Sequence, residues 1–207
     1  LPICVGKTTL FKLVMGLLKP ARGRITINGI DVHSIPNAEK KYLFGYVDQG
    51  FNLIKGSVAD QISLRDASIP RDKIAHALEF AEMAEYVASL PEGMDTEVAG
   101  DALFSQGQKQ LLAIARAIVT DPPILLLDEI TANLDSITEE KILSVLREAG
   151  KEHMVLSISH RLSSIVASDA IVILEEGRIK NAGTREELAE KDEWFRGHLG
   201  LEKLTWN

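Results

Sequence analysis

Short apolar runs alternate with longer stretches of helical spacing in the second half of the chain. A short apolar run bounded by turn residues is typical of a buried strand, and apolar residues three and four apart are typical of an amphipathic helix. The elements predicted here are, in order, a strand over 124–127, a helix over 136–149 and strands over 154–158 and 171–174. This alternation predicts an α/β fold in which helices flank a mostly parallel sheet.

The first half of the chain has a less regular pattern. Its predicted elements are a helix over 8–18, a strand over 24–29, a strand over 43–47 and a helix over 74–88. Pro20 ends the first helix because proline cannot continue one, and Asn28-Gly29 is typical of a tight hairpin turn. We expect the region from about 51 to 122 to form an inserted helical subdomain.

Several helix starts are indicated by capping boxes, in which a Ser or Thr and a Glu or Gln three residues later bond to each other's backbone N–H groups. This spacing occurs at Ser105 with Gln108, Ser136 with Glu139, and Thr184 with Glu187. The charged stretch that runs to Asn207 is expected to form one or two further helices.

Composition narrows the class of protein. A chain of 207 residues, 45% hydrophobic and 26% charged, is typical of one globular domain. The net charge of -7 argues against nucleic acid as the main partner. Cys4 is the only cysteine, which excludes an internal disulfide and fits a reducing compartment. No run reaches the roughly 20 apolar residues that span a bilayer, so any membrane-spanning part is expected on other residues.

A candidate phosphate-binding loop lies at the start of the chain. Gly6-Lys7-Thr8 matches the second half of the motif G-x-x-x-x-G-K-[ST], whose backbone N–H groups cradle phosphates, whose Lys contacts them and whose hydroxyl binds Mg²⁺. Leu1 stands where the opening glycine belongs. Glycine permits conformations that are costly for other residues, so either the loop is degenerate or the chain is truncated or out of frame before Gly6.

A second candidate site follows the predicted strand over 124–127. Asp128 and Glu129 come directly after it, so a buried strand would deliver two carboxylates at its end. Asp128 would hold Mg²⁺ through water, and Glu129 would polarise the attacking water as general base. The alternative is an ordinary buried strand that ends in acidic surface residues.

Motifs in a fixed order connect these two sites. In chain order they are Gly6-Lys7-Thr8-Thr9, Tyr46-Val47-Asp48-Gln49, Ser105-Gln106-Gly107-Gln108, Ile124 to Glu129, Thr131 to Asp135, and Ser159-His160-Arg161-Leu162. The order resembles the nucleotide-binding domain of ATP-binding cassette (ABC) transporters: Walker A loop, glutamine loop, signature, Walker B strand, D-loop and switch histidine. Cys4, Asp48, Phe104 and Gln106 depart from the residues usual at their positions. The resemblance implies a P-loop NTPase fold, with residues 1–207 forming one cassette that is truncated at the Walker A loop.

The resemblance also implies a role for each motif. The catalytic residues would be Glu129, His160 and Gln49. Mg²⁺ would be held by Thr8, Gln49 and Asp128. ATP would be bound by Gly6, Lys7, Thr8 and Thr9 and, on a partner cassette, by Ser105, Gln106, Gly107, Gln108 and Asp135. A helix N-terminus suits the last group, because its free N–H groups attract phosphate.

The Ser-His-Arg-Leu segment and residues 51–62 are similar to exporter-type cassettes, in which membrane and ATPase domains share one polypeptide. The implied partners are a second cassette, as a homodimer or heterodimer, and a transmembrane domain of the same or another polypeptide, with no nucleic acid. The implied location is the cytoplasmic face of the membrane. Two alternatives are a degenerate cassette with a structural role, which Leu1 and Cys4 favour, and a soluble ABC ATPase that acts on ribosomes or DNA.

Overall fold

The computed structural model describes residues 6–48, 50–132, 134–159, 161, 165, 168–197 and 199. Within them the α-helices are α1 (Lys7–Val14), α2 (Asn37–Leu43), α3 (Val58–Ser63), α4 (Arg71–Phe80), α5 (Ala84–Ala88), α6 (Gln106–Ile118), α7 (Ser136–Ala149) and α9 (Arg185–Lys191). The short 3₁₀ helices are η1 (Gly93–Asp95) and η2 (Asp101–Leu103). The strands are β1 (Thr26–Ile27), β2 (Ile30–Asp31), β3 (Phe44–Val47), β4 (Gly56–Ser57), β5 (Glu97–Val98), β6 (Ile124–Asp128), β7 (Met154–Ile158), β8 (Ile171–Glu175) and β9 (Arg178–Gly183).

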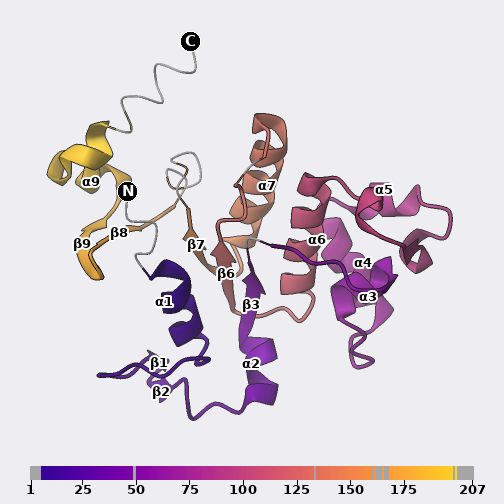
Figure 1. The fold of residues 1–207 in the computed structure, drawn as a ribbon, viewed down its shortest axis with the longest axis horizontal. Coiled ribbons are helices and arrows are strands. Elements are labelled where there is room, and N and C mark those ends of the chain that lie inside the picture. Colours follow the sequence, from indigo (N-terminus) through magenta and orange to yellow (C-terminus); the bar gives the residue numbers. More distant parts are fainter. Residues whose placement is uncertain are drawn as a thin grey trace.

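A parallel sheet with the strand order β3-β6-β7 lies at the centre of the molecule (Figure 1). Strand β6 is buried along its whole length, as expected for a strand that has neighbours on both edges and helices on both faces. Its first residue pairs with Phe44 of β3 and its last residue pairs with Ile158 of β7. The α/β class and the parallel sheet predicted from the sequence are confirmed for β3, β6 and β7. Strand β8, which was expected to belong to the same alternation, instead pairs antiparallel with β9 in a separate two-stranded sheet.

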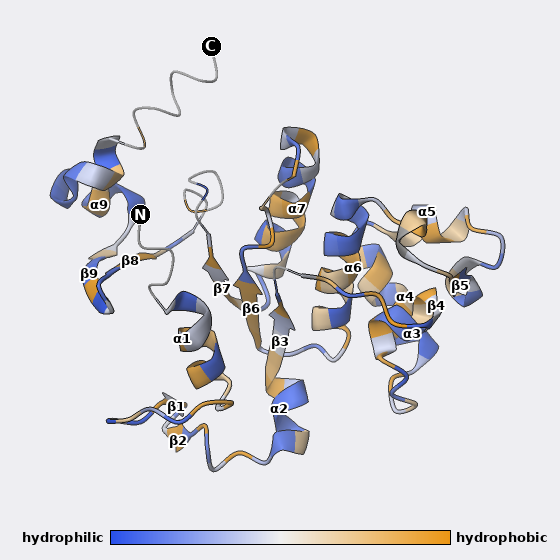
Figure 2. Ribbon diagram, viewed as in Figure 1, coloured by the Kyte–Doolittle hydropathy of each residue, from blue (hydrophilic) through white to orange (hydrophobic). Residues whose placement is uncertain are grey.

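Alternate residues of β6 belong to different parts of the core. Leu125 and Leu127 pack into a large cluster with the apolar side of α6, whereas Ile124 and Leu126 pack with Phe11 of α1. The side chains of a strand alternate between its faces, so α1 covers one face and α6 the other. Figure 2 shows the hydrophobic strands at the centre and the more hydrophilic α9 at one side.

Helices α3 and α4 pack against α6, within the region where a helical insert is expected. The helix predicted over 74–88 is instead two helices, α4 and α5, because Glu82 between them has a left-handed backbone with φ of 53°. The antiparallel pair of β4 and β5 was not predicted. Both strands are two residues long, too short to leave a hydrophobic period in the sequence.

Helix α1 ends at Val14 rather than at Leu18, so the predicted end is wrong. Gly16 has φ of 66°. Its N–H donates to the Leu13 carbonyl, and the N–H of Leu17 donates to the Lys12 carbonyl at 2.8 Å. These two bonds form a Schellman motif, in which a left-handed glycine ends the helix before proline can do so.

The other helix starts agree more closely with the sequence. The capping boxes at Ser105 and Thr184 are confirmed, and β1 and β2 form the hairpin predicted at Asn28-Gly29. Helix α7 begins at Ser136, but its N-cap is Asp135, whose side chain accepts from the N–H of Thr138. The predicted box of Ser136 with Glu139 is therefore wrong. Helix α2 and strand β9 were not predicted.

Candidate functional site

The end of β6 meets the start of α1. Asp128 is the last residue of β6 and is buried. The hydroxyl of Thr8, in the first turn of α1, donates a hydrogen bond of 2.6 Å to Asp128 Oδ2, although the two residues are 120 positions apart. The packing of Phe11 against the sheet holds α1 in this place. The structure thus brings the two candidate sites of the sequence together.

A second contact lies beside the first. Lys7 Nζ is 4.0 Å from Glu129 Oε1, and both side chains are about a quarter exposed, at 24% and 25%. Glu129 has φ of 54°, a left-handed conformation that costs a residue with a Cβ roughly 1–2 kcal/mol. Its N–H donates to the carbonyl of Ile158 on β7 at 2.9 Å. The neighbouring strand therefore fixes the turn that follows β6.

The charges at this junction act on one another. Burial lowers the pKa of Lys7, and the negative charges of Glu129 and Asp128 oppose that shift. Burial raises the pKa of Tyr46 on β3, and the charges of Asp128 and Asp48 raise it further. A phosphate placed beside these carboxylates would be repelled unless a cation offset the charge. The junction therefore suits a bound cation together with a polyanion.

The donor set fits Mg²⁺. The Thr8 hydroxyl and the Asp128 carboxylate are hard oxygen donors within hydrogen-bond distance of each other, and Mg²⁺ is bound in proteins by oxygen ligands of this kind. Gln49, the third expected ligand, lies outside the described residues.

The N-terminus of α1 has the local form of a phosphate-binding turn. Gly6, its N-cap residue, has φ of 79°, a conformation that favours glycine. No acidic residue of α1 itself lies in its first turn, so the carboxylates near the positive end of the helix dipole are those of Asp128 and Glu129. Thr9 lies in the same turn and is exposed.

The N-terminus of α6 is closed by its own side chains. Ser105 Oγ accepts from the N–H of Gln108 at 3.2 Å, and Gln108 Oε1 accepts from the N–H of Ser105 at 2.8 Å. Gln106 is exposed and Gly107 is buried. These bonds hold the loop–helix junction in one conformation.

Gly107 and Asp135 meet through Thr138 of α7. A Cβ on Gly107 would lie 2.2 Å from Thr138 Cγ2, so only glycine fits at this position. Asp135 accepts from the N–H of Thr138 at 3.0 Å and from its hydroxyl at 2.7 Å. These bonds, the backbone bond first, lower the pKa of Asp135. Thr138 was not among the residues predicted for the site, although an N-cap side chain commonly bonds to the N–H of the residue at the third position of a helix.

Two expected catalytic residues, Gln49 and His160, lie outside the described residues. Arg161, which follows His160 in the chain, is described. Its guanidinium forms an ion pair with Glu139 of α7 and donates to the carbonyl of Leu134 at 3.3 Å. Arg161 is thereby bonded to the start of α7 and to the residue before Asp135. No sequence pattern pointed to Glu139 as the partner of Arg161, because their pairing depends on tertiary structure.

Comparison with known proteins assigns the family. Residues 4–132 match the family model described as ABC transporter. The chain therefore belongs to the ABC transporter family, which confirms the resemblance seen in the motifs. ABC transporter domains of this kind bind ATP.

The relatives include an exporter and a flippase. The chain is 37% identical over 192 residues to an ATM1-type heavy metal exporter of Novosphingobium aromaticivorans, covering 92% of this chain and 32% of that protein. It is 38% identical over 196 residues to an ATP-dependent lipid A-core flippase of Ralstonia nicotianae, covering 93% of this chain and 33% of that protein. The chain thus spans about a third of the length of these relatives.

A solved structure agrees with these relatives. A bacterial Atm1-family ABC exporter with ATP bound superposes with a TM-score of 0.85 at 35% identity, covering 97% of this chain and 35% of that one. The P-loop NTPase fold expected from the motifs is confirmed by this match. Among the described residues, no helix is both long and apolar enough to cross a membrane.

Proposed function

We propose that this chain is the ATP-binding and ATP-hydrolysing cassette of an exporter. The observation that carries the proposal is the junction of α1 with β6, where Thr8 bonds to Asp128 and Lys7 lies beside Glu129. A helix N-terminus, a lysine and two carboxylates are the groups that triphosphate hydrolysis requires in one place. The names of the relatives support export as the process that hydrolysis drives.

Each residue of the junction has a proposed task. The N–H groups after Gly6 and the ammonium of Lys7 bind the terminal phosphates and offset their charge. Glu129 takes the proton of the attacking water as general base. Thr8 and Asp128 hold Mg²⁺, which when bound withdraws charge from the phosphate oxygens. Gln49 and His160 are proposed to orient the water and the terminal phosphate.

The second half of the proposed site comes from another cassette. Ser105, Gln106, Gly107, Gln108 and Asp135 would bind ATP held by the partner, so two cassettes close head to tail around ATP. Gly107 of α6 lies against Thr138 of α7, and Thr138 is bonded to Asp135. The proposed ATP-binding residues of α6 and of the start of α7 would therefore form one surface. ATP then favours the paired state because both cassettes contact it.

The partners and location follow from the same proposal. A transmembrane domain, on the same or another polypeptide, would be moved when the cassettes close and released when hydrolysis separates them. The cassette would lie at the cytoplasmic face of the membrane, where ATP is available. In these two relatives about two thirds of the length lies outside the matching segment.

The test is Glu129→Gln in the full-length protein. The variant should bind ATP with unchanged affinity and hydrolyse it at least about 100-fold more slowly, because the general base is lost and the charge is removed without a change of shape. Hydrolysis at the wild-type rate would remove Glu129 from its role. Failure of the wild-type protein to bind labelled ATP would instead favour the degenerate cassette that Leu1 and Cys4 suggest.

A further inference from the structure

Helix α6 carries functional groups at both ends. Its N-terminus, capped by Ser105, begins the proposed partner-facing motif, and Arg116 lies in its last turn. Arg116 is 11 positions after Ser105 in the chain, which corresponds to roughly 16 Å along an α-helix. A packed helix of this length moves as one stiff unit. A displacement of α6 at Arg116 therefore also displaces its N-terminus at Ser105.

Arg116 contacts two other parts of the chain. Its Nε donates to the carbonyl of Gln61 on α3 at 2.6 Å. Its guanidinium carbon lies 4.2 Å from the centre of the Phe51 ring, within the range of a cation–π interaction. Phe51 is two residues after Gln49 in the chain. Arg116 is therefore one point where α6 contacts the segment that begins at Phe51.

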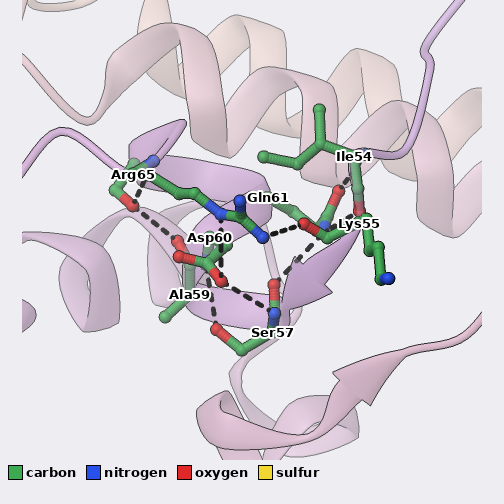
Figure 3. A network of polar contacts seen from close by, with 8 residues as sticks. Ile54, Lys55, Ser57, Ala59, Asp60, Gln61 and Arg65 are labelled. Carbon is green, nitrogen blue, oxygen red and sulfur yellow. Dashed lines mark hydrogen bonds and ion pairs between the residues drawn. The ribbon is translucent and has the colours of Figure 1, made fainter.

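The segment from Phe51 to Ser57 is fixed to α3 by a second set of bonds (Figure 3). Gln61 is fully buried. Its Nε2 donates to the carbonyls of Ile54 and Ser57 at 2.8 and 3.2 Å, and its Oε1 accepts from the N–H of Ile54 at 2.8 Å. Arg65 also donates to the carbonyl of Lys55 in this segment. The segment and α3 thus form one unit, which Arg116 joins to α6.

The partial burial of Arg116 is unfavourable for the free energy of folding. Among the described residues its Nη2 is buried without a hydrogen-bond partner. Burial lowers the pKa of Arg116 to about 10, opposed by the negative charge of Asp48, so the side chain is still a cation at neutral pH. Arg116 is half-buried, and a partly buried cation with one buried, unused donor is unfavourable for stability alone. The packing of α6 against α3 does not require an arginine at position 116. An apolar residue would fill the same space with a smaller desolvation penalty.

We propose that Arg116 is a positioning residue that couples the segment from Phe51 to Ser57 to the N-terminus of α6. When this segment moves, the contacts with Phe51 and Gln61 transmit the displacement along α6 to Ser105 and Gly107. The inference rests on the proposed function, since it assumes that this end of α6 binds ATP on a partner cassette. The proposed role of Arg116 is to position α6, and it includes no contact with ATP.

The experiment uses the full-length protein in a Glu129→Gln background and compares two measurements with labelled ATP. The equilibrium affinity for ATP reports on the site at α1. Retained ATP, which is the ATP that stays bound after free nucleotide is removed, reports on closure against the partner's α6. Arg116→Lys keeps the positive charge but removes the planar guanidinium group, which donates to the Gln61 carbonyl and stacks on the Phe51 ring. It should change ATP affinity by less than about twofold and reduce retained ATP by about tenfold, within the range of coupling between sites.

Two further variants separate coupling from packing. Phe51→Leu leaves Arg116 in place and removes the stacked ring, so retained ATP should fall in the same direction by about threefold. The matched control is Arg65→Lys, because Arg65 holds the same segment but does not contact α6 through the bonds described. It should leave retained ATP within about twofold of the background protein.

Each outcome decides the proposal. Normal retention in both Arg116→Lys and Phe51→Leu overturns it, and so does an equal loss in Arg65→Lys, which would assign the effect to anchoring of the segment. A parallel loss of ATP affinity and melting temperature in Phe51→Leu would make the contact one of packing only. If the Glu129→Gln protein itself retains no ATP, the proposed function fails before coupling is reached.

Discussion

The Thr8 hydroxyl and the Asp128 carboxylate share a 2.6 Å hydrogen bond across a sequence separation of 120 residues. The contact joins the first turn of α1 to the end of β6. It exists because Phe11 and Leu126 pack in the same cluster and hold the helix against the sheet. The core of the protein thus determines the geometry of the site.

This contact gives a prediction about metal dependence. Thr8→Val keeps the shape of the side chain but removes the oxygen, so it should raise the Mg²⁺ concentration for half-maximal ATP hydrolysis by about tenfold or more. Thr8→Ser keeps the oxygen and serves as the control. ATP hydrolysis measured against Mg²⁺ concentration checks the prediction. The same Mg²⁺ dependence in wild type and Thr8→Val would show that this hydroxyl is no ligand.

A second prediction concerns the contact between Gly107 and Thr138. Gly107→Ala places a methyl group 2.2 Å from Thr138 Cγ2 and should cost about 1–3 kcal/mol of unfolding free energy through overpacking. Thr138→Ser removes that methyl group and keeps the hydroxyl that bonds to Asp135. The double variant Gly107→Ala/Thr138→Ser should therefore recover most of the loss in melting temperature.

The single and double variants also distinguish two possible roles of Gly107, one in packing and one in binding the partner's ATP. If the double variant regains stability and also retains ATP normally, glycine is required for packing alone. If stability returns while retention of ATP stays low, Gly107 is needed for approach of the partner's phosphate as well. No recovery of stability in the double variant would show that the clash lies elsewhere.

The pKa of Asp135 gives a prediction about pH. It is lowered, chiefly by the backbone N–H of Thr138, so the ionised carboxylate favours the folded state. Its contribution is complete above the unfolded-state pKa of about 3.9 and is lost as pH falls through the lower folded-state value. Asp135→Asn keeps a good N-cap without a titrating group. Its melting temperature should fall less steeply below pH 4 than that of the wild type, and parallel curves would contradict this.

The sequence predicted the sheet and the order of motifs because both depend on local pattern. Strand β6 is a continuous apolar run followed by two carboxylates, and β7 has the predicted bounds. The capping box at the start of α6 depends only on Ser105 and Gln108, which are three positions apart. These features are specified within a few residues, so a reader of the sequence alone can find them.

The remaining features depend either on tertiary structure or on a choice between two local signals of similar strength. The end of α1 is set by Gly16, whose left-handed backbone is confined between Lys40 and Val32. The N-cap of α7 is Asp135 rather than Ser136, a shift of one residue that the sequence leaves open because both types cap helices. The contact of Gly107 with Thr138 likewise needs α6 and α7 in their final places.

A last prediction concerns the ion pair of Arg161 with Glu139. The carboxylate side chain is only 10% exposed, and the arginine is 38% exposed. Removing the cation from a nearly buried carboxylate is costly, so Arg161→Met should lower the free energy of unfolding by about 1–3 kcal/mol. In Arg161→Met/Glu139→Met no charge is left behind, and the loss should be smaller than the sum of the two single losses. Melting curves of the wild type, the two single variants and the double variant give this coupling energy. Additive losses would show that Arg161 acts on α7 through the Leu134 carbonyl rather than through the carboxylate.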